Sequence, residues 1–335
     1  MNLFFFGWPS EYGGADTKAA HLLQLLAPHL SITVIPNSSL SLQEKCWTDK
    51  FDQWGIAYRS LESLPQQLEG TALALCNAHF FTGGIYSIAR RRGLRVVWSS
   101  EMMWHHRHEV ELIQAGAIDR LLYVSEVQRT CLNYESFCNV PTRMVGNYIS
   151  PQAFPFVPRK VDGSITIGRL SRADLDKYPE DFPVFYEALQ IPGAQFRVMA
   201  WSPALQEKYR WHHFDERWTL LEPNALAAGD FLQSLDLFIY TLGHHFVESW
   251  GRSTLEAMLT GAIPLVPHGH NFDHLIEHGV TGFQCSDFRE FQTYAMELAD
   301  NPMARQQMSH ACRERAEQLN DAVTHLEIWL EALDV

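Results

Sequence analysis

The chain has 335 residues, about twice the commonest size of a single domain, so two domains are expected. Its residues are 46% hydrophobic, 19% charged and 12% aromatic, which excludes a disordered, collagen-like or coiled-coil chain. Lys and Arg number 26 and Asp and Glu number 39, for a net charge of -13. This acidic balance argues against a general nucleic-acid binder, which needs a basic surface for the phosphates.

Most of the negative charge lies in the second half. Residues 1–150 hold 12 basic and 13 acidic residues, whereas residues 151–335 hold 14 basic and 26 acidic ones. The difference favours two domains with different partners, although a solvated acidic surface would give the same counts.

Several features predict a cytoplasmic protein. No apolar run reaches the roughly 18–20 residues of a membrane span. The apolar start, residues 1–7, is too short for a signal peptide and lacks its basic segment, so a buried strand is the better interpretation. The six cysteines include no C-x-x-C pair, which is typical of a reduced compartment.

In the first half, apolar runs of strand length alternate with amphipathic stretches of helix length. The predicted strands are residues 3–7, 31–35, 71–78, 94–98 and 120–124. Helices are predicted at 17–27, at 80–92, and from a capping box at 125–128. This order indicates a mostly parallel sheet with helices on both faces.

Residues 146–162 break this rhythm, because they carry three prolines without a clear period, and they are the best linker candidate. The rhythm then restarts with strands at 164–167, 196–200, 218–221, 236–240 and 263–266. Helices follow at 182–189, 227–234, 253–260, 287–299, 303–319 and 322–333. We therefore expect two doubly wound α/β domains facing across a cleft, residues 1–150 and 151–320, and a C-terminal helix at 321–335 that could pack back on the first domain.

The loop after the first strand is a candidate anion site. Gly13 and Gly14 would let the backbone approach a ligand, and the following helix N-terminus would offer unpaired N–H groups. An ordinary strand-to-helix turn would carry such a glycine pair as well.

Three cations, Arg169, Arg172 and Lys177, follow the first strand of the second half. Arginine forks and a lysine point charge suit a diphosphate. Alternatively, Asp174 and Asp176 pair with these cations at the surface, where such pairs contribute little. The two aspartates also form a D-x-D metal pattern, but nearby cations oppose a divalent ion.

Two carboxylates mark the segment after the strand at 236–240. Glu248 precedes Gly251 in a loop, and Glu256 lies in the first turn of a helix. Both can accept hydrogen bonds from sugar or ribose hydroxyls, and backbone N–H groups of residues 251–253 can face an anion. Taken alone, Glu256 fits a capping box with Ser253, and Glu248 fits a solvated loop.

Together these motifs resemble glycosyltransferase family 4, a retaining family of the GT-B fold. The pair Glu248 and Glu256 with seven residues between, the small-residue helix and the run 261–266 look like its donor motif. The stretch 168–170 with Lys177 matches the family's phosphate-binding stretch, and residues 280–283 match its next strand. Gly13 and Gly14 match its N-terminal glycine loop.

The resemblance implies a role for each residue. Arg169 and Lys177 would hold the donor diphosphate and stabilise the departing nucleotide, with Arg172 sharing that role. Glu248 would contact the transferred sugar, so that Arg169, Lys177 and Glu248 are the expected catalytic residues, and Glu256 would bind the ribose. The remaining donor-binding residues would be Gly13, Gly14, Ser249, Trp250, Gly251, Arg252 and Ser253. The implied reaction keeps the anomeric configuration and needs no metal or other cofactor, because cations and a helix N-terminus offset the developing charge.

On the acceptor side the sequence departs from the family pattern. Members often carry a histidine after the strand that matches residues 94–99, and Glu101, His105 or His106 could fill that place. A helix-surface histidine is the alternative interpretation. Trp201 stands where the family has a glycine pair and could narrow the donor pocket.

Two further stretches have alternative interpretations. His274 and His278, in the histidine-rich stretch 268–278, have a spacing that can bind zinc on a helix, but a sugar-pocket or surface role is favoured. The basic run 90–95 could contact an anionic membrane or acceptor, although solvated helix-end cations are the favoured interpretation.

The sequence thus predicts a metal-independent retaining hexosyltransferase that moves a sugar from a nucleotide-diphosphate sugar to a carbohydrate, glycolipid or small glycoside acceptor, with at most peripheral membrane contact. The alternatives are a sugar-nucleotide epimerase or hydrolase on the same fold, and a non-catalytic nucleotide-sugar binder. Because the acidic second half would repel a diphosphate, Arg169, Arg172 and Lys177 are expected to govern donor affinity.

Overall fold

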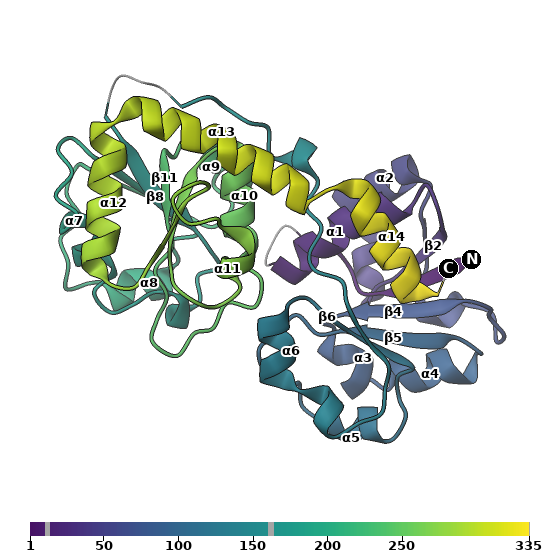
Figure 1. Ribbon diagram of the computed structural model, residues 1–335. Coiled ribbons are helices and arrows are strands. Elements are labelled where there is room, and N and C mark those ends of the chain that lie inside the picture. The colour runs from purple at the N-terminus through teal and green to yellow at the C-terminus, as the bar shows by residue number, and fades with distance from the viewer. Residues whose placement is uncertain (11–13, 160–163, 335) are drawn as a thin grey trace. The chain divides into compact units, whose positions relative to one another are not determined.

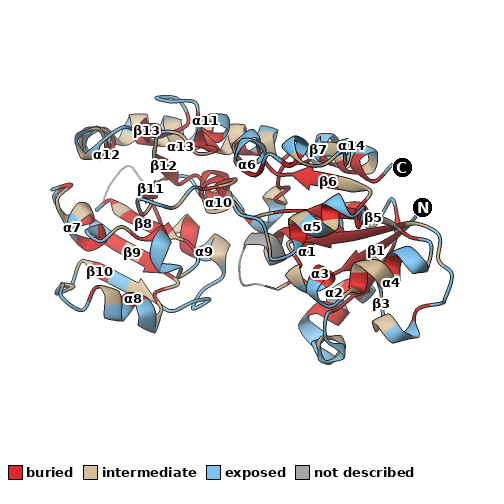
Figure 2. Cartoon of the chain, turned by 90° about the horizontal axis from the view of Figure 1, so that it is seen from below, coloured by how far each residue is buried: buried red, intermediate tan, exposed pale blue. Residues whose placement is uncertain are grey.

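A computed structural model describes residues 1–10, 14–159 and 164–334, with the backbone alone at 14–16 (Figure 1). The chain divides into two compact units. Unit 1 comprises Met1–Ile149 and Ala322–Val335, and unit 2 comprises Ser150–Asp321. Each unit contains one parallel sheet, whose central strands form its buried layer (Figure 2).

Unit 1 is built on a seven-stranded sheet in the order β3-β2-β1-β4-β5-β6-β7. Its strands are β1 (Asn2–Phe6), β2 (Ser31–Ile35), β3 (Ala57–Tyr58), β4 (Thr71–Leu75), β5 (Arg95–Ser99), β6 (Arg120–Tyr123) and β7 (Thr142–Met144). Its helices include α1 (Gly14–Leu26), α2 (Lys45–Trp54), α3 (Ala78–Thr82), α4 (Ile85–Arg91), α5 (Glu109–Gln114), α6 (Glu126–Leu132) and α14 (Ala322–Leu333).

Both faces of this sheet are apolar, which explains why helices cover each of them. Leu3 and Phe5 of β1 belong to a core shared with α1, α2 and the Trp329 side of α14. Phe4 and Phe6 point the other way, into a second core with α3, α4 and α5. Alternation along a buried strand places successive side chains on opposite faces, as a doubly wound sheet requires.

Unit 2 repeats this plan with six parallel strands in the order β10-β9-β8-β11-β12-β13. The strands are β8 (Thr166–Leu170), β9 (Gln195–Met199), β10 (Trp218–Leu221), β11 (Leu237–Ile239), β12 (Ile263–Pro267) and β13 (Phe283–Cys285). Its helices include α7 (Phe182–Glu187), α8 (Pro203–Lys208), α9 (Ala228–Gln233), α10 (Arg252–Thr260), α11 (Phe272–Leu275), α12 (Phe288–Asp300) and α13 (Pro302–Leu319). The predicted doubly wound α/β architecture is confirmed.

Local signals explain where the elements agree with the sequence prediction and where they differ. Ser125 caps α6 as predicted, because its hydroxyl accepts the N–H of Gln128 at 3.1 Å. The single helix predicted at 80–92 is wrong: α3 and α4 are separate, and Gly84 has φ +66° between them. Glycine favours that left-handed conformation, which interrupts a helix. None of the described helices is long and apolar enough to cross a membrane.

Each sheet reverses its strand order at one point. In unit 1 the reversal lies between β1 and β4, and in unit 2 it lies between β8 and β11. The chain leaves these neighbouring strands in opposite directions, so a crevice forms at their carboxyl ends, where ligands bind in open α/β sheets. Any site within either unit is therefore expected at these two positions.

Candidate functional site

The cations and carboxylates of unit 2 meet at its point of strand reversal. Arg169 lies in β8, Lys177 ends the following 3-10 turn Leu175–Lys177, and Glu248 lies in the loop after β11. Two glycines allow the backbones to approach this closely. A Cβ on Gly168 would lie 2.1 Å from the carbonyl of Arg197, and one on Gly243 would lie 2.3 Å from the carbonyl of Asp176.

Lys177 and Glu248 form an ion pair that includes Tyr240. The Lys177 ammonium donates to Glu248 Oε2 and to the Tyr240 hydroxyl, each at 3.0 Å, and that hydroxyl donates to Glu248 Oε2 at 2.9 Å. The Lys177 and Glu248 side chains are 10% and 11% exposed, so the pair is largely shielded from solvent. An ammonium has three donors. The third N–H of Lys177 makes no hydrogen bond within the described chain, and the ammonium also lies over the ring of Phe246, 4.7 Å from its centre.

The pair holds both groups in their charged forms. Burial alone would lower the pKa of Lys177, but Tyr240 and Glu248 raise it above its ordinary value. Burial opposes ionisation of Glu248 as well, yet Lys177 and the Tyr240 hydroxyl leave its pKa below the usual range. Burial and the Glu248 charge raise the pKa of Tyr240 to about 12, so its hydroxyl stays a donor at neutral pH.

Arg169 contacts both Lys177 and Tyr240 of this cluster. Its guanidinium has no exposed surface and stacks on the rings of Tyr178 and Tyr240, 4.0 and 4.7 Å from their centres. It donates to the carbonyl of Thr241 at 2.9 Å and to that of Lys177 at 3.2 Å. In this structure the guanidinium presents no atom to solvent. The phosphate contact of Arg169 stays a prediction.

The beginning of α10 brings Arg252 and Glu256 together. They form an ion pair of 2.9 Å in which both side chains are nearly buried. Burial raises the pKa of Glu256, and Arg252 opposes that shift. The alternative interpretation of Glu256, a capping box with Ser253, is wrong. Gly251 is the N-cap and has φ +84°, and Glu256 forms its ion pair with Arg252.

Gly251 should tolerate no side chain, because its left-handed backbone faces α11. A Cβ there would lie 2.9 Å from the Phe272 ring and 3.0 Å from Leu275. We expect Gly251→Ala to lower the free energy of unfolding by about 2–4 kcal/mol, through backbone strain and overpacking. Urea unfolding measures this effect.

Gly193→Ala is the matched control in the same unit. Gly193 has φ +71°, but a Cβ there would meet nothing within 4 Å. Its substitution should cost about 1–2 kcal/mol from the backbone alone. Equal losses in the two variants would contradict the predicted clash at Gly251.

Two side chains after β12 hold the Glu248 loop. The N–H of Glu248 donates to Nδ1 of His270 at 3.2 Å, and the amide of Asn271 donates to the carbonyl of Trp250 at 3.0 Å. Ser249 lies between these two bonds, so the backbone of the loop is fixed on both sides of it. We call His270 and Asn271 the loop clamp.

Other predicted residues lie elsewhere. Arg172 is exposed and pairs with Asp174 at 3.0 Å, as the surface alternative described. Among described residues no group of three metal-ligating side chains occurs. His274 and His278, the disfavoured zinc pair, do not share a helix, because α11 ends at Leu275. His278 stacks on His268, with ring centres 6.3 Å apart.

The acceptor-side candidates belong to unit 1. Glu101 forms a buried ion pair of 2.7 Å with Lys18. His105 bonds through Nε2 to the carbonyl of Leu132 at 3.1 Å, and His106 Nε2 lies 3.7 Å from the sulfur of Cys76. Of the predicted glycine pair, Gly14 is the first residue of α1, and Gly13 lies outside the described residues.

Sequence reasoning missed Tyr240, His270 and Asn271. Tyr240 carried a usable signal, because it ends the strand at the point of reversal, where side chains reach a ligand crevice. His270 belongs to a histidine-rich stretch, and its bond to a backbone N–H leaves no trace in the sequence. Trp201 was expected to narrow the donor pocket; it is buried and stacks on Tyr209, with ring centres 5.7 Å apart.

Solved glycosyltransferases share this architecture. Neither a family model nor a curated protein matches the sequence. Anabaena HepE, solved with UDP and glucose, is similar in structure over 100% of this chain and 99% of its own, with TM-score 0.76 and 14% identity. A Rickettsia africae glycosyltransferase gives 0.75 at 11% identity over 99% and 98% of the two chains. Sucrose-phosphate synthase of Thermosynechococcus elongatus gives 0.70 at 12% identity over 98% and 97%. The chain therefore has the GT-B fold of these glycosyltransferases.

Proposed function

We propose that this protein is a retaining glycosyltransferase of the family 4 type. It would move a sugar from a nucleotide-diphosphate sugar to a hydroxyl of a carbohydrate, glycolipid or small glycoside, without a metal, in the cytoplasm. The observation that carries the proposal is the Lys177–Tyr240–Glu248 cluster at the point of strand reversal in unit 2. Structural neighbours solved with UDP and UDP-glucose support a nucleotide-sugar donor.

The cluster suits the departure of a nucleoside diphosphate. As the glycosidic bond breaks, negative charge develops on the diphosphate, and the third N–H of Lys177 can donate to it. The N-terminus of the nine-residue helix α10 adds backbone N–H groups of the same polarity. Glu248, kept ionised by Lys177, can accept hydrogen bonds from the transferred sugar, and Glu256 from the ribose. Such groups are oriented before the reaction, which is how electrostatic stabilisation accelerates it.

The direct test incubates the protein with UDP-, GDP- and ADP-sugars and measures nucleotide release, with and without acceptor glycosides. The anomeric configuration of the product, read by NMR, distinguishes retention from inversion, and EDTA tests metal independence. Conversion of the donor to another nucleotide sugar would replace the proposal with an epimerase. Binding without turnover under every condition would leave a non-catalytic binder.

The loop clamp predicts an acidic limit to activity. Burial lowers the pKa of His270 below its ordinary value of 6.5, against the opposing charges of Glu248 and Asp273. Neutral His270 accepts the N–H of Glu248, and protonated His270 cannot. As pH falls below about 6.5, His270 becomes protonated in the unfolded chain before it does in the folded protein. The free energy of unfolding therefore declines until the pH reaches the pKa of His270 in the folded protein. Turnover should fall as folded His270 becomes protonated and the loop is released.

His270→Asn separates this effect from other titrations. Asparagine tolerates the backbone φ of +58° at this position and offers an acceptor that does not titrate. We expect the acid limb of the kcat–pH profile to move to lower pH in this variant, with turnover at pH 8 largely retained. An unchanged acid limb would show that another group, such as Glu256 with its raised pKa, sets it.

A further inference from the structure

The first turn of α10 carries a positive charge where a helix disfavours one. Arg252 is the first residue of this nine-residue helix, directly after the N-cap Gly251. The aligned peptide dipoles make a helix N-terminus positive, so a cation in the first turn destabilises the helix. The pair with Glu256 also has the weaker order, because an acid four residues before a base stabilises a helix more than the reverse. The stability of α10 therefore does not explain an arginine at this position.

Glu256 depends on this ion pair for its charge. Its side chain is 11% exposed, and Nε of Arg252 lies 2.9 Å from its Oε1. Burial raises the pKa of Glu256, and Arg252 is the charge that opposes this shift. Among the described residues no second cation or hydrogen-bond donor contacts the carboxylate. Without Arg252, this carboxyl group would be buried with nothing to favour its ionised form.

Other charges around α10 are engaged elsewhere. Helices α9 and α13 pack against it, and α11 contacts its N-cap. Strand β12, which also contacts α10, carries no titratable residue. None of the titratable groups on these helices is among the influences on the pKa of Glu256. Those on α9 and α11 are exposed, and the arginines of α13 donate to backbone carbonyls; they are Asp230, Asp273 and His274, and Arg305, Arg313 and Arg315.

We propose that Arg252 is a positioning residue, which keeps Glu256 ionised and oriented to accept a hydroxyl of the donor ribose. The ribose contact of Glu256 rests on the proposed function, whereas the ion pair does not. The resemblance to family 4 implies a donor contact of Arg252, and the ion pair gives its side chain a different task. A hydrogen bond to an ionised acceptor is roughly twice as strong as one to a neutral acceptor. The charge of Glu256 therefore determines how strongly a ribonucleotide is preferred to a 2′-deoxyribonucleotide.

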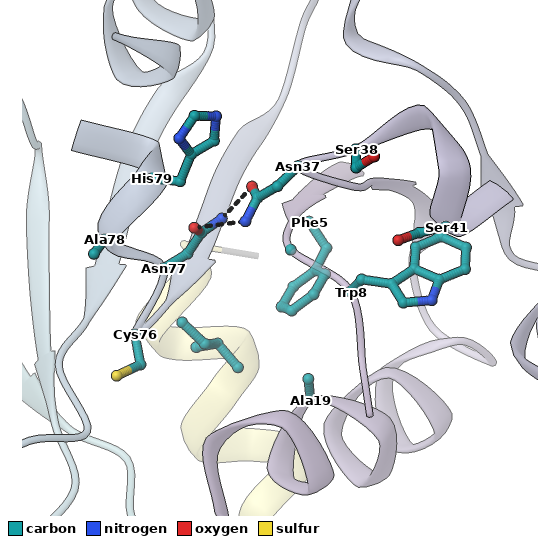
Figure 3. Close-up of a pocket in the computed structure, with 12 residues that line it drawn as sticks. Phe5, Trp8, Ala19, Asn37, Ser38, Ser41, Cys76, Asn77, Ala78 and His79 are labelled. Carbon is teal, nitrogen blue, oxygen red and sulfur yellow. Dashed lines mark hydrogen bonds between the residues drawn. The ribbon is translucent and has the colours of Figure 1, made fainter. Parts of the chain in front are cut away.

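The point of strand reversal in unit 1 offers no comparable pair of charges among its described residues. Its cavity of about 360 Å³ is bordered by the amides of Asn37 and Asn77, which bond to each other at 3.0 and 2.9 Å (Figure 3). Cys76 and His79 are the titratable side chains of the described lining, which holds no Asp, Glu, Lys or Arg. A nucleoside diphosphate therefore finds its carboxylate and its lysine and arginine partners in unit 2, and its binding reports on that unit.

The test compares a ribonucleoside diphosphate with its 2′-deoxy form on the full chain. UDP, GDP and ADP are titrated by calorimetry, and the tightest of them is compared with its deoxy form from pH 8 down to pH 5. Both forms carry the same base and diphosphate, so titration of the phosphates and of His270 cancels in the ratio of the two Kd values. The native chain should bind the ribose form about tenfold more tightly at pH 8, the effect of one charge-assisted hydrogen bond. This preference should decline as the pH falls through the raised pKa of Glu256.

Arg252→Met removes the charge and keeps most of the length of the side chain. The preference for ribose should then disappear at a pH about one unit or more above that of the native chain, because no cation opposes the effect of burial on Glu256. Arg252→Lys keeps a cation and should recover most of the native profile. Circular dichroism shows that each variant is folded.

Two further variants separate the charge of Glu256 from other effects. Glu256→Gln should leave a weak preference for ribose that does not change with pH, because glutamine does not titrate. Arg210→Met removes an exposed pair with Glu207 in the same unit and should retain the native profile.

An unchanged pH profile in Arg252→Met would overturn the proposal, because an arginine with only a structural role does not set the charge of Glu256. Equal loss of affinity for both forms at every pH would also overturn it, since Arg252 would then bind the phosphates directly. The expected profiles without turnover of any nucleotide sugar would uphold the role of Arg252 and overturn the proposed function. Turnover with equal affinity for the two forms would do the reverse, and no binding of any nucleoside diphosphate would overturn both.

Discussion

Lys177→Met is expected to lower kcat about 100- to 1,000-fold, which is the usual effect of removing one preorganised donor to a developing negative charge. Methionine keeps the length of the side chain and removes all three N–H donors. Two of those donors fix Tyr240 and Glu248 at 3.0 Å, and the third is the one that can reach a leaving diphosphate. The measurement is kcat and KM for the donor at saturating acceptor, with circular dichroism to show that the variant is folded.

The same substitution also affects folding, because it leaves Glu248 buried without its counterion. Losing one partner of a buried pair costs about 3–5 kcal/mol. The double variant Lys177→Met/Glu248→Gln removes both charges, so it should recover much of the stability and none of the turnover. Arg210→Ala, which removes an exposed pair with Glu207, should change neither. Turnover that recovers along with stability would mean that Lys177 only holds Glu248 in place.

Much of the fold could be predicted because its strands are short, apolar and buried. The run 71–75 is buried at every position, and such a run indicates a central strand whatever surrounds it. Helix ends were less certain, since they depend on single backbone angles. The predicted helix at 80–92 ignored Gly84, whose left-handed φ of +66° separates α3 from α4.

The site was predictable only in part, for a physical reason. Lys177 and Glu248 were chosen independently from motifs, and the fold brings them together across 71 residues of sequence. Tyr240, whose hydroxyl joins them, belongs to no motif, and its only signal is its position at the end of the strand at the point of reversal. The bond between the Glu248 N–H and His270 uses a backbone group, so no residue pattern could indicate it.

Arg169→Lys is expected to lower the free energy of unfolding by about 2–4 kcal/mol, although it conserves the charge. The planar guanidinium joins the carbonyls of Thr241 and Lys177 while it stacks between Tyr178 and Tyr240. An ammonium on a flexible stem cannot make these contacts together. Because the carbonyl of Lys177 would lose its support, turnover should fall together with stability, and urea unfolding with kcat measures both.

The control is Arg159→Lys, which changes another buried arginine of unit 2. Arg159 donates to the carbonyls of Gly261, Gln233 and Leu235 at 3.0, 2.7 and 2.5 Å, and its guanidinium contacts none of the proposed site residues. This variant should lose similar stability and keep the kcat of the folded enzyme. If Arg169→Lys instead loses turnover at full stability, the guanidinium leaves its aromatic cage to contact phosphate, as the family resemblance implies. The two variants therefore distinguish a positioning arginine from one that touches the donor.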